Sequence, residues 1–352
     1  MAIKQFFSRL SSSSLSLVGL ATLLLLSWGT LAPVGTLTWW LNLETEELNL
    51  DKDKPPNGLL PDDRSSADNS EQQCYIVFLP GVGNTGGGNL PAGETEFLQR
   101  LTTTHPDCVA VDDVFPYSIG QQTLVEDNPL AGVWRAAEQD EGVVGQVFIN
   151  IRNFWQMALS ADDRYGPTYN WAIAVETIER MQAKLPIRDR DRPLKLILIG
   201  TSGGAQVAVG TTPYLNRWLN AEITPILIGG FFEGTEGFAA AEQIYHLRGD
   251  RDWIEGVAAV VFPARWRWTV GSPFNQARRE GKFVDQISGP HEHQGDEGYF
   301  GETQVQGQQS YLDLTLQEVK QLPVWQSTTV NKTSIRLTMQ SENRHKALAH
   351  HQ

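Results

Sequence analysis

The chain has 352 residues, with 41 acidic against 28 basic side chains, a formal net charge of −13 and only two cysteines. This length allows one large domain or two ordinary ones, and it is ample for a sizeable core. The excess of acids argues against a nucleic-acid partner, which would require clustered Lys and Arg. Two cysteines exclude a disulfide-rich scaffold, and no Cys/His spacing predicts a metal site.

Residues 10–43 contain no charged side chain. A helix needs roughly 20 residues to cross a bilayer, so we predict that residues 1–43 form a short tail and a transmembrane anchor. Pro33 follows the best candidate cleavage site, which favours an uncleaved anchor over a cleaved signal peptide and a secreted product. Because Lys4 and Arg9 precede the span and acids follow it, we expect a cytoplasmic N-terminus and an extracytoplasmic remainder.

The chain beyond the anchor divides by composition. Residues 44–73 are rich in Asp, Glu, Pro and Ser and are predicted to form a disordered acidic tether, because they cannot bury enough apolar surface to fold. A folded domain should span residues 74–301, with a possible cap or lid insertion at 117–170. Residues 302–352 should hold a C-terminal helix near 310–321 and a flexible tail.

Short apolar runs alternate with helical patterns inside the domain. Strands are predicted at 74–79, 108–111, 194–200, 224–230 and 243–249, and helices at 94–103, 171–185 and 204–219. The strand segments are continuously apolar rather than alternating, which is typical of strands buried on both faces. Strands separated by helices predict an α/β fold with a doubly wound, mostly parallel sheet.

The strongest local motif is G-x-S-x-G at Gly200-Thr201-Ser202-Gly203-Gly204, directly between a predicted strand and a predicted helix. A serine in this context lies on a strained turn, and its neighbours must lack bulky side chains. The N–H groups at the start of the helix then point toward negative charge that develops during a reaction. Ser202 is therefore the candidate nucleophile.

A serine nucleophile needs a base and an orienting acid. Most of the seven histidines lie in the tail or at strand positions away from Ser202, which leaves His291 and His293 in a Gly-rich loop. We favour His293 and keep His291 as the alternative. Asp252, in the loop after the strand at 243–249, is the favoured acid, with Asp250 and Glu233 as alternatives.

An oxyanion hole should complete the site. One donor is the N–H of Gly203, which follows the nucleophile. The second is expected from the Gly-rich turn after the first strand, where we favour the Val82 N–H.

These motifs together resemble the α/β-hydrolase superfamily over residues 74–301. The matching segments are LPGVG for the oxyanion turn, GTSGG for the nucleophile, GDRDWI for the acid and HEHQGDEGYF for the histidine loop. Two features depart from the usual pattern: Pro80 stands where the superfamily often has His, and the acid follows the serine too closely for a large cap between them. Any cap would therefore come from the insertion at 117–170.

The resemblance implies a serine hydrolase that acts on carboxylic esters or thioesters without a cofactor. The aromatic-rich insertion and the segment 262–268, placed beside a membrane anchor, suggest an apolar acyl-binding face and a small-molecule or lipid-derived ester as substrate. Two other functions stay open. The fold could serve as a non-catalytic, membrane-anchored binding or assembly factor, or an alcohol could replace water and make the protein an acyltransferase.

A dinucleotide-binding protein is the less favoured alternative. Residues 81–86 also spell G-x-G-x-x-G after a strand, and Asp112 ends the next strand. The Gly- and Pro-rich residues that follow cannot open the helix that this motif requires.

Cys74 and Cys108 begin two strands that should be neighbours in the sheet. In an oxidising compartment they could form a disulfide across the strand ends. Two buried free thiols are the other interpretation, which we prefer on sequence alone.

Overall fold

The computed structural model describes residues 53–60, 73–84, 90–117, 143–187, 194–305, 307 and 309–325. The predicted anchor, much of the predicted tether and the C-terminal tail lie outside these ranges. None of the helices within them combines the length and the apolar character that a membrane span requires.

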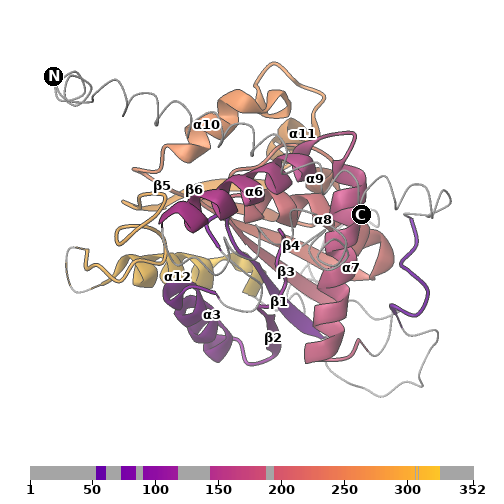
Figure 1. The fold of residues 1–352 in the computed structure, drawn as a ribbon, viewed down its shortest axis with the longest axis horizontal. Helices are drawn as coiled ribbons and strands as arrows, with labels where there is room; N and C mark the ends of the chain where they lie inside the picture. The colour runs from indigo at the N-terminus through magenta and orange to yellow at the C-terminus, as the bar shows by residue number, and fades with distance from the viewer. Residues whose placement is uncertain are drawn as a thin grey trace, which may run out of the picture.

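A six-stranded sheet forms the centre of the domain (Figure 1). Its strands are β1 (Cys74–Leu79), β2 (Cys108–Val111), β3 (Leu194–Thr201), β4 (Ala221–Ile228), β5 (Ile244–Gly249) and β6 (Phe283–Gly289). Their order is β2-β1-β3-β4-β5-β6, and every neighbouring pair is parallel. The predicted parallel α/β sheet is therefore confirmed.

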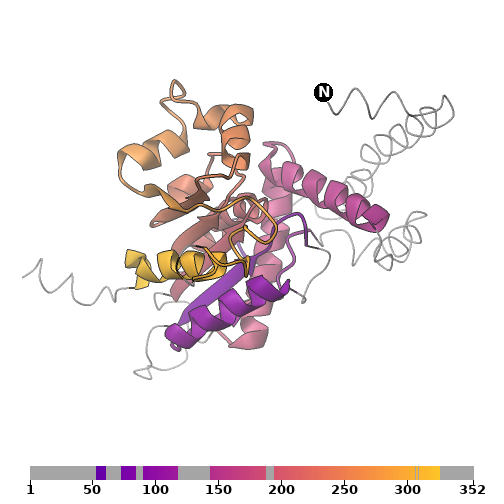
Figure 2. The same cartoon turned by 90° about the vertical axis from the view of Figure 1, so that its left-hand side faces the viewer.

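Helices cover both faces of this sheet. They are α3 (Ala92–Thr104), α6 (Val143–Ala161), α7 (Gly166–Lys184), α8 (Gly204–Trp218), α9 (Gly237–Ala240), α10 (Ile254–Val261), α11 (Pro273–Arg279) and α12 (Tyr311–Gln321). α3 and α12 lie side by side on one face (Figure 2) and share an apolar cluster with it. α7, α8, α9 and α11 contribute to a second cluster on the opposite face.

β1 shows why the strand segments are apolar throughout. All six of its residues are buried. Tyr75, Val77 and Leu79 point into the cluster with α7 and α8, whereas Ile76 and Phe78 point into the cluster with α3 and α12. Since alternate side chains of a strand face opposite sides, a sheet covered on both faces requires apolar residues at every position.

Two segments differ from the sequence predictions. Residues 53–60, predicted as part of a disordered tether, pack on the domain: Leu60 is buried in the core, and Asp53 pairs with Arg217 at 2.7 Å. The pair of leucines in this otherwise polar stretch supplies enough apolar surface to dock it. β6 was not predicted, because it lies at the sheet edge and its burial alternates rather than being continuous.

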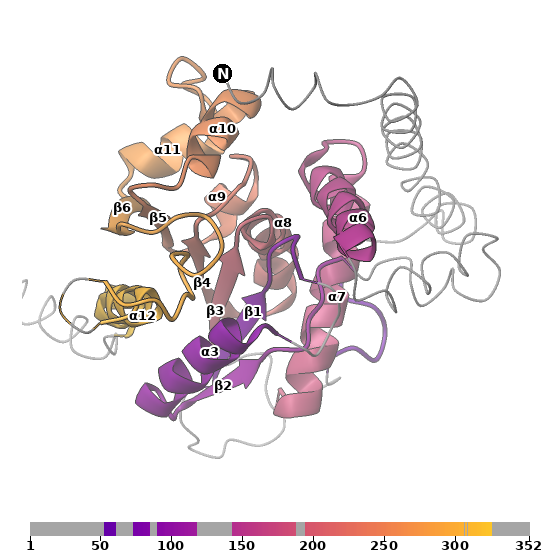
Figure 3. The same ribbon diagram turned by 60° about the vertical axis from the view of Figure 1, so that its left-hand side comes forward.

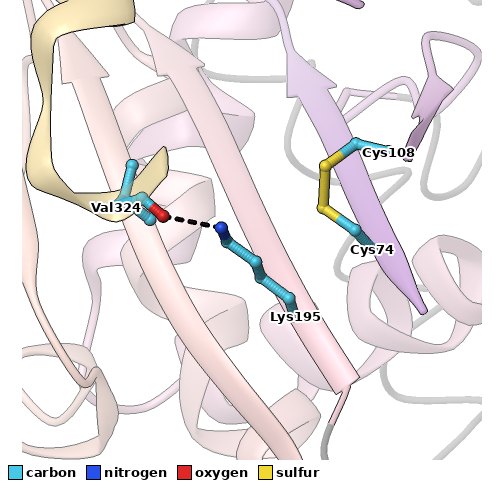
Figure 4. The surroundings of a disulfide bond; sticks show 4 residues. All are labelled: Cys74, Cys108, Lys195 and Val324. Carbon is cyan, nitrogen blue, oxygen red and sulfur yellow. Dashed lines mark hydrogen bonds between the residues drawn. A yellow bond between two sulfur atoms is a disulfide. The ribbon is translucent and has the colours of Figure 1, made fainter. Parts of the chain in front are cut away.

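A disulfide joins Cys74 to Cys108 at the amino ends of β1 and β2 (Figure 4). These two residues are direct partners in the register of the parallel strands, with Cα atoms 4.4 Å apart. The preference for two free thiols is therefore wrong. Parallel pairing in this register brings the two side chains within bonding distance, which sequence spacing alone does not specify.

The strand order reverses between β1 and β3, since the chain runs outward to β2 on one side and to β4 on the other. Parallel sheets bind ligands at such a switch point, beyond the carboxyl ends of the strands. The turn after β1 and the turn after β3 meet there. α6 and α10 lie toward the same end of the molecule (Figure 3), α10 directly after β5.

Candidate active site

Ser202 lies on the sharp turn between β3 and α8. Its φ is +48°, and among the described residues it is the only non-glycine with a positive φ. The Ser202 N–H donates to the Ile228 carbonyl at 3.1 Å, and its own carbonyl accepts from the Phe231 N–H at 3.0 Å. The backbone of β4 and the following loop therefore holds a conformation that serine rarely adopts.

The flanking glycines make room for this turn. A Cβ on Gly204 would lie 2.1 Å from the Leu79 carbonyl oxygen, and one on Gly200 would lie 2.6 Å from the Cα of Ala205. Neither position tolerates a side chain. β3 and α8 can therefore approach β1 closely enough to bring Ser202 beside the turn after β1.

The structure brings Ser202, His293 and Asp252 together in one hydrogen-bonded chain. Ser202 Oγ lies 2.9 Å from His293 Nε2. His293 Nδ1 lies 2.9 and 3.1 Å from the two carboxylate oxygens of Asp252. The Asp252 side chain is fully buried and that of His293 is 10% exposed, so the chain of groups is shielded from water except near the serine.

Two further hydrogen bonds hold the Asp252 carboxylate. Tyr299 donates its hydroxyl proton at 2.7 Å, and the Ile254 N–H donates at 2.9 Å. Burial opposes ionisation of Asp252, but these bonds and the bond from His293 favour the carboxylate and hold its pKa below the ordinary value. Asp252 is therefore an ionised acceptor for the imidazole N–H.

Tyr299 is a site residue that the sequence analysis missed. Its hydroxyl accepts from the Gly249 N–H at 2.7 Å while donating to Asp252, which links the end of β5 to the acid. A Cβ on Gly229 would lie 2.4 Å from the Tyr299 ring and 3.1 Å from an Asp252 oxygen. The glycine at the end of β4 thus leaves the space that both side chains occupy. Tyr299 lies in the histidine loop, but neither its position nor its distance from the histidines along the sequence indicates a role in the site.

The alternative base lies elsewhere. His291 is fully buried, lies 3.0 Å from the Ser288 carbonyl oxygen through Nε2, and stacks on the Tyr299 ring. Burial lowers its pKa, which favours the neutral ring. His291 therefore supports the loop from within the core rather than contacting Ser202.

The alternative acids are also separate from His293. Asp250 is exposed, and its backbone N–H pairs with the Gly289 carbonyl. The Glu233 carboxylate accepts from the Thr235 hydroxyl at 3.2 Å in a different cavity, beside α7 and α8. Burial raises the pKa of Glu233 to about 7. Neither side chain joins the hydrogen-bonded chain at Ser202.

The two candidate oxyanion donors, Val82 and Gly203, lie in adjacent turns: a Cβ on Gly203 would lie 2.7 Å from Val82 Cγ1. The Gly81 carbonyl accepts from the Asn84 N–H, so the Val82 N–H, on the far side of the same trans peptide, points out of the turn. The Ser202 carbonyl accepts from the Ala205 and Phe231 N–H groups. The Gly203 N–H belongs to the same trans peptide and therefore points in the opposite direction. Within the described part of the chain, neither N–H donates a hydrogen bond.

α6 fixes the orientation of this turn, a role that no sequence motif indicated. The buried Asn153 amide donates to the carbonyls of Val82 at 2.9 Å and Asn84 at 2.7 Å. Gln146, about two turns earlier on α6, donates to the Gly83 carbonyl at 3.2 Å. α6 belongs to the predicted insertion at 117–170, of which residues 118–142 lie outside the described ranges.

A cavity of about 310 Å³ opens beside the serine. Ser202, His293 and the turn at 81–84 form one part of its wall, and Glu94 and Phe300 belong to another. None of the residues 262–268 is among the described residues that line it.

The structure offers little for a bound nucleotide or metal in the described ranges. α3 begins only at Ala92, so the Gly-rich turn at 81–84 does not open a helix, and Asp112 forms an ion pair with Lys184 at 2.9 Å. No group of three or more His, Cys, Asp or Glu side chains suited to a metal ion occurs among the described residues.

Comparisons with protein-family models, with curated proteins and with solved structures find no match for this chain. The parallel α/β sheet and the geometry around Ser202 are therefore the basis for a functional assignment.

Proposed function

We propose that this protein is a serine hydrolase of the α/β-hydrolase type, which cleaves carboxylic esters or thioesters through an acyl-enzyme. The observation that supports this proposal is the hydrogen-bonded chain from Ser202 through His293 to Asp252, with 2.9 Å between serine and imidazole. A nucleophile, a base and an orienting acid in this geometry are the recurring machinery of acyl transfer on unrelated folds.

In the proposed mechanism, His293 Nε2 takes the proton from Ser202 Oγ as this oxygen bonds to the ester carbonyl carbon. The carbonyl electron pair moves onto its oxygen, where the Val82 and Gly203 N–H groups stabilise the negative charge. Asp252 stabilises the resulting imidazolium. His293 then gives the proton to the leaving oxygen or sulfur as the bond between that atom and the acyl carbon breaks and the carbonyl re-forms.

Water completes the cycle. His293 takes a proton from the water as its oxygen bonds to the acyl carbon, and the proton passes to Ser202 Oγ as the acyl–serine bond breaks. The acid is released and the serine is restored. If an alcohol takes the place of water, the same steps produce acyl transfer, so product analysis distinguishes the two outcomes.

The proposal extends to location: a single-pass membrane protein with its catalytic domain outside the cytoplasm. The uncharged segment 10–43 and the charges that flank it support the anchor and its orientation. The Cys74–Cys108 disulfide is consistent with an oxidising compartment. Protease added to sealed vesicles that enclose the cytoplasmic side should then degrade the domain, and non-reducing peptide mapping should recover the bonded pair. Protection of the domain would contradict the orientation.

Exposed apolar side chains support action near a lipid surface. Trp253 is 68% exposed, Val260 on α10 is 72% exposed and Trp268 is 74% exposed. All three lie in the segment that follows the acid Asp252. Large apolar groups gathered on one surface segment commonly mark an interaction with membrane or protein.

Fluorophosphonate labelling of the full-length protein in detergent tests the reaction class. Wild type should be labelled at one residue, and Ser202→Ala should abolish the label. Asp252→Asn should slow labelling strongly, whereas the matched control Asp250→Asn should not, because Asp250 is exposed and separate from His293. If wild type stays unlabelled, or Ser202→Ala is still labelled, a non-catalytic binding role would replace the hydrolase.

A further inference from the structure

One ionisable group in the catalytic cavity has no role in the mechanism above. Glu94 lies in the first turn of α3 and lines the same cavity as Ser202 and His293. Its Oε2 atom is buried and has no hydrogen-bond partner in the described structure, while the residue as a whole is half-buried at the cavity wall. No Lys or Arg occurs among the described residues that line the cavity, and its one histidine, His293, is engaged with Ser202 and Asp252.

The neighbouring tyrosine does not satisfy Glu94 either. Tyr117 gives its single hydroxyl proton to the Pro80 carbonyl at 3.1 Å. Burial and the charge of Glu94 raise the pKa of Tyr117, which is the effect of a nearby acid rather than of a hydrogen bond from it. Glu94 is thus an acid that approaches Tyr117 without binding it.

Leaving a buried carboxylate oxygen unpaired is costly, because that oxygen loses its hydration without gaining a partner. Burial raises the pKa of Glu94 to about 7, so the carboxyl is poised between its neutral and its charged form. A bound cation would supply the missing partner and favour the charged form. Perturbed acids of this kind concentrate at binding and catalytic sites.

The rest of the cavity also suits a cation on a short apolar stem. Val82 and Ile228 provide apolar wall, and Tyr299 and Phe300 add aromatic residues, a type whose rings attract ammonium groups. A volume of about 310 Å³ is at the small end of ligand cavities, which favours a short substituent over a long acyl chain. The net charge of −13 further attracts cationic ligands.

We propose that Glu94 binds the ammonium or guanidinium group of a cationic ester whose carbonyl is attacked by Ser202. This inference rests on the proposed hydrolase function and narrows its substrate class. Either the acyl chain or the leaving alcohol of the substrate can carry the positive group, and the same carboxylate recognises it in both cases.

Two pairs of isosteric esters distinguish these sources with the full-length protein. For the acyl side, nitrophenyl β-alaninate carries an ammonium where nitrophenyl butyrate carries a methyl group. For the alcohol side, acetylcholine is compared with its uncharged isostere, dimethylbutyl acetate. The measured quantity is the ratio of kcat/KM for the charged ester to that for the neutral one.

Glu94→Gln keeps the shape of the side chain and removes its charge. In at least one pair, this variant should lower the ratio by about 10-fold or more, because a charged hydrogen bond is lost, while the neutral ester changes by less than about 3-fold. Glu96→Gln is the matched control: Glu96 lies on the same helix but is exposed and pairs with Arg100. Equal ratios for wild type and Glu94→Gln in both pairs would overturn the inference.

A binding measurement separates this inference from the reaction itself. Butylammonium should bind the Ser202→Ala variant about 10-fold more tightly than the double variant that also carries Glu94→Gln. Butanol, which is uncharged, should bind the two variants equally. If butylammonium binds the two variants differently while wild type is neither labelled by the fluorophosphonate nor able to hydrolyse an ester, the cation site stands and the hydrolase proposal fails. If hydrolysis is found but butylammonium binds equally, the cation site fails alone.

Discussion

Replacing Glu94 by Gln should change how the stability of the protein depends on pH. The pKa of Glu94 is raised from its ordinary value of 4.5 to about 7 in the folded protein. The folded state therefore holds the proton more tightly than the unfolded state does. The contribution of the protonated Glu94 carboxyl to stability is fully present below pH 4.5 and is lost as the pH rises through about 7.

The size of the effect follows from the same two values. One pKa unit corresponds to about 1.4 kcal/mol, so ionising Glu94 in the folded protein costs about 3 kcal/mol above pH 7. Gln stays neutral at every pH and avoids this cost. Relative to wild type, Glu94→Gln should thus gain about 3 kcal/mol in unfolding free energy between pH 4.5 and pH 8.

The assay is urea denaturation of full-length wild type and variant in the same detergent at pH 5, 6, 7 and 8. The difference between the two proteins cancels the titration of all other groups that the substitution leaves unperturbed. Glu96→Gln provides the control, since removing one partner of its exposed ion pair with Arg100 should shift stability by less than about 1 kcal/mol at any pH.

A difference between wild type and Glu94→Gln that stays constant from pH 5 to pH 8 would refute the reasoning. It would mean that the Glu94 carboxylate is hydrated or paired in the folded protein. The cavity would then hold no acid that lacks a partner, and the proposed cation site would lose its main support.

Three further substitutions test other parts of the structure. Asp252→Asn should lower kcat by about 10⁴-fold in an ester-hydrolysis assay while Asp250→Asn stays near wild type, because the acid orients the imidazole and stabilises its charge; equal rates would reject Asp252 as the acid. Asn153→Ala should lower kcat/KM by about 10- to 100-fold with the protein still folded by circular dichroism, since the amide fixes the oxyanion turn; an unchanged rate would assign Asn153 to packing alone. Replacing Cys74 and Cys108 by Ala should cost about 3–4 kcal/mol in urea denaturation, as expected for cross-linked residues 34 positions apart, and reductant should reproduce that loss in wild type; a variant as stable as wild type would contradict this.

The strands that could be predicted from the sequence are those buried on both faces of the sheet. β1, β2, β3 and β5 follow their predicted segments closely because strands covered on both faces need continuous apolar runs. β4 starts earlier than predicted, at Ala221, because its first residues are half-exposed yet pair with β3. β6 gave no signal, since an edge strand with alternating burial resembles a polar loop in sequence.

The site divides in the same way. Ser202 follows β3 directly and Asp252 lies in the loop after β5, so the local sequence marks where both residues lie. The choice between His291 and His293 could not be local, because neighbouring positions in one loop differ only in how tertiary packing turns them. Asn153 lies on a helix whose apolar pattern gives no information about the carbonyls that its amide contacts. Tyr299 contacts Asp252, which comes from a different loop, so no local pattern marks the tyrosine.

The Cys74–Cys108 bond lies at the end of β1 where the chain arrives from its N-terminal segment, and Ser202 lies beyond the other end of that strand. β1 is hydrogen-bonded to β2 on one side and β3 on the other, so tension on the N-terminal segment acts along these strands as a shear load. The covalent bond passes that load to β2 at the first residue of β1. In the proposed membrane-anchored protein, any pull that passes the docked segment 53–60 would therefore be shared by β1 and β2 before it reached the turn at 81–84.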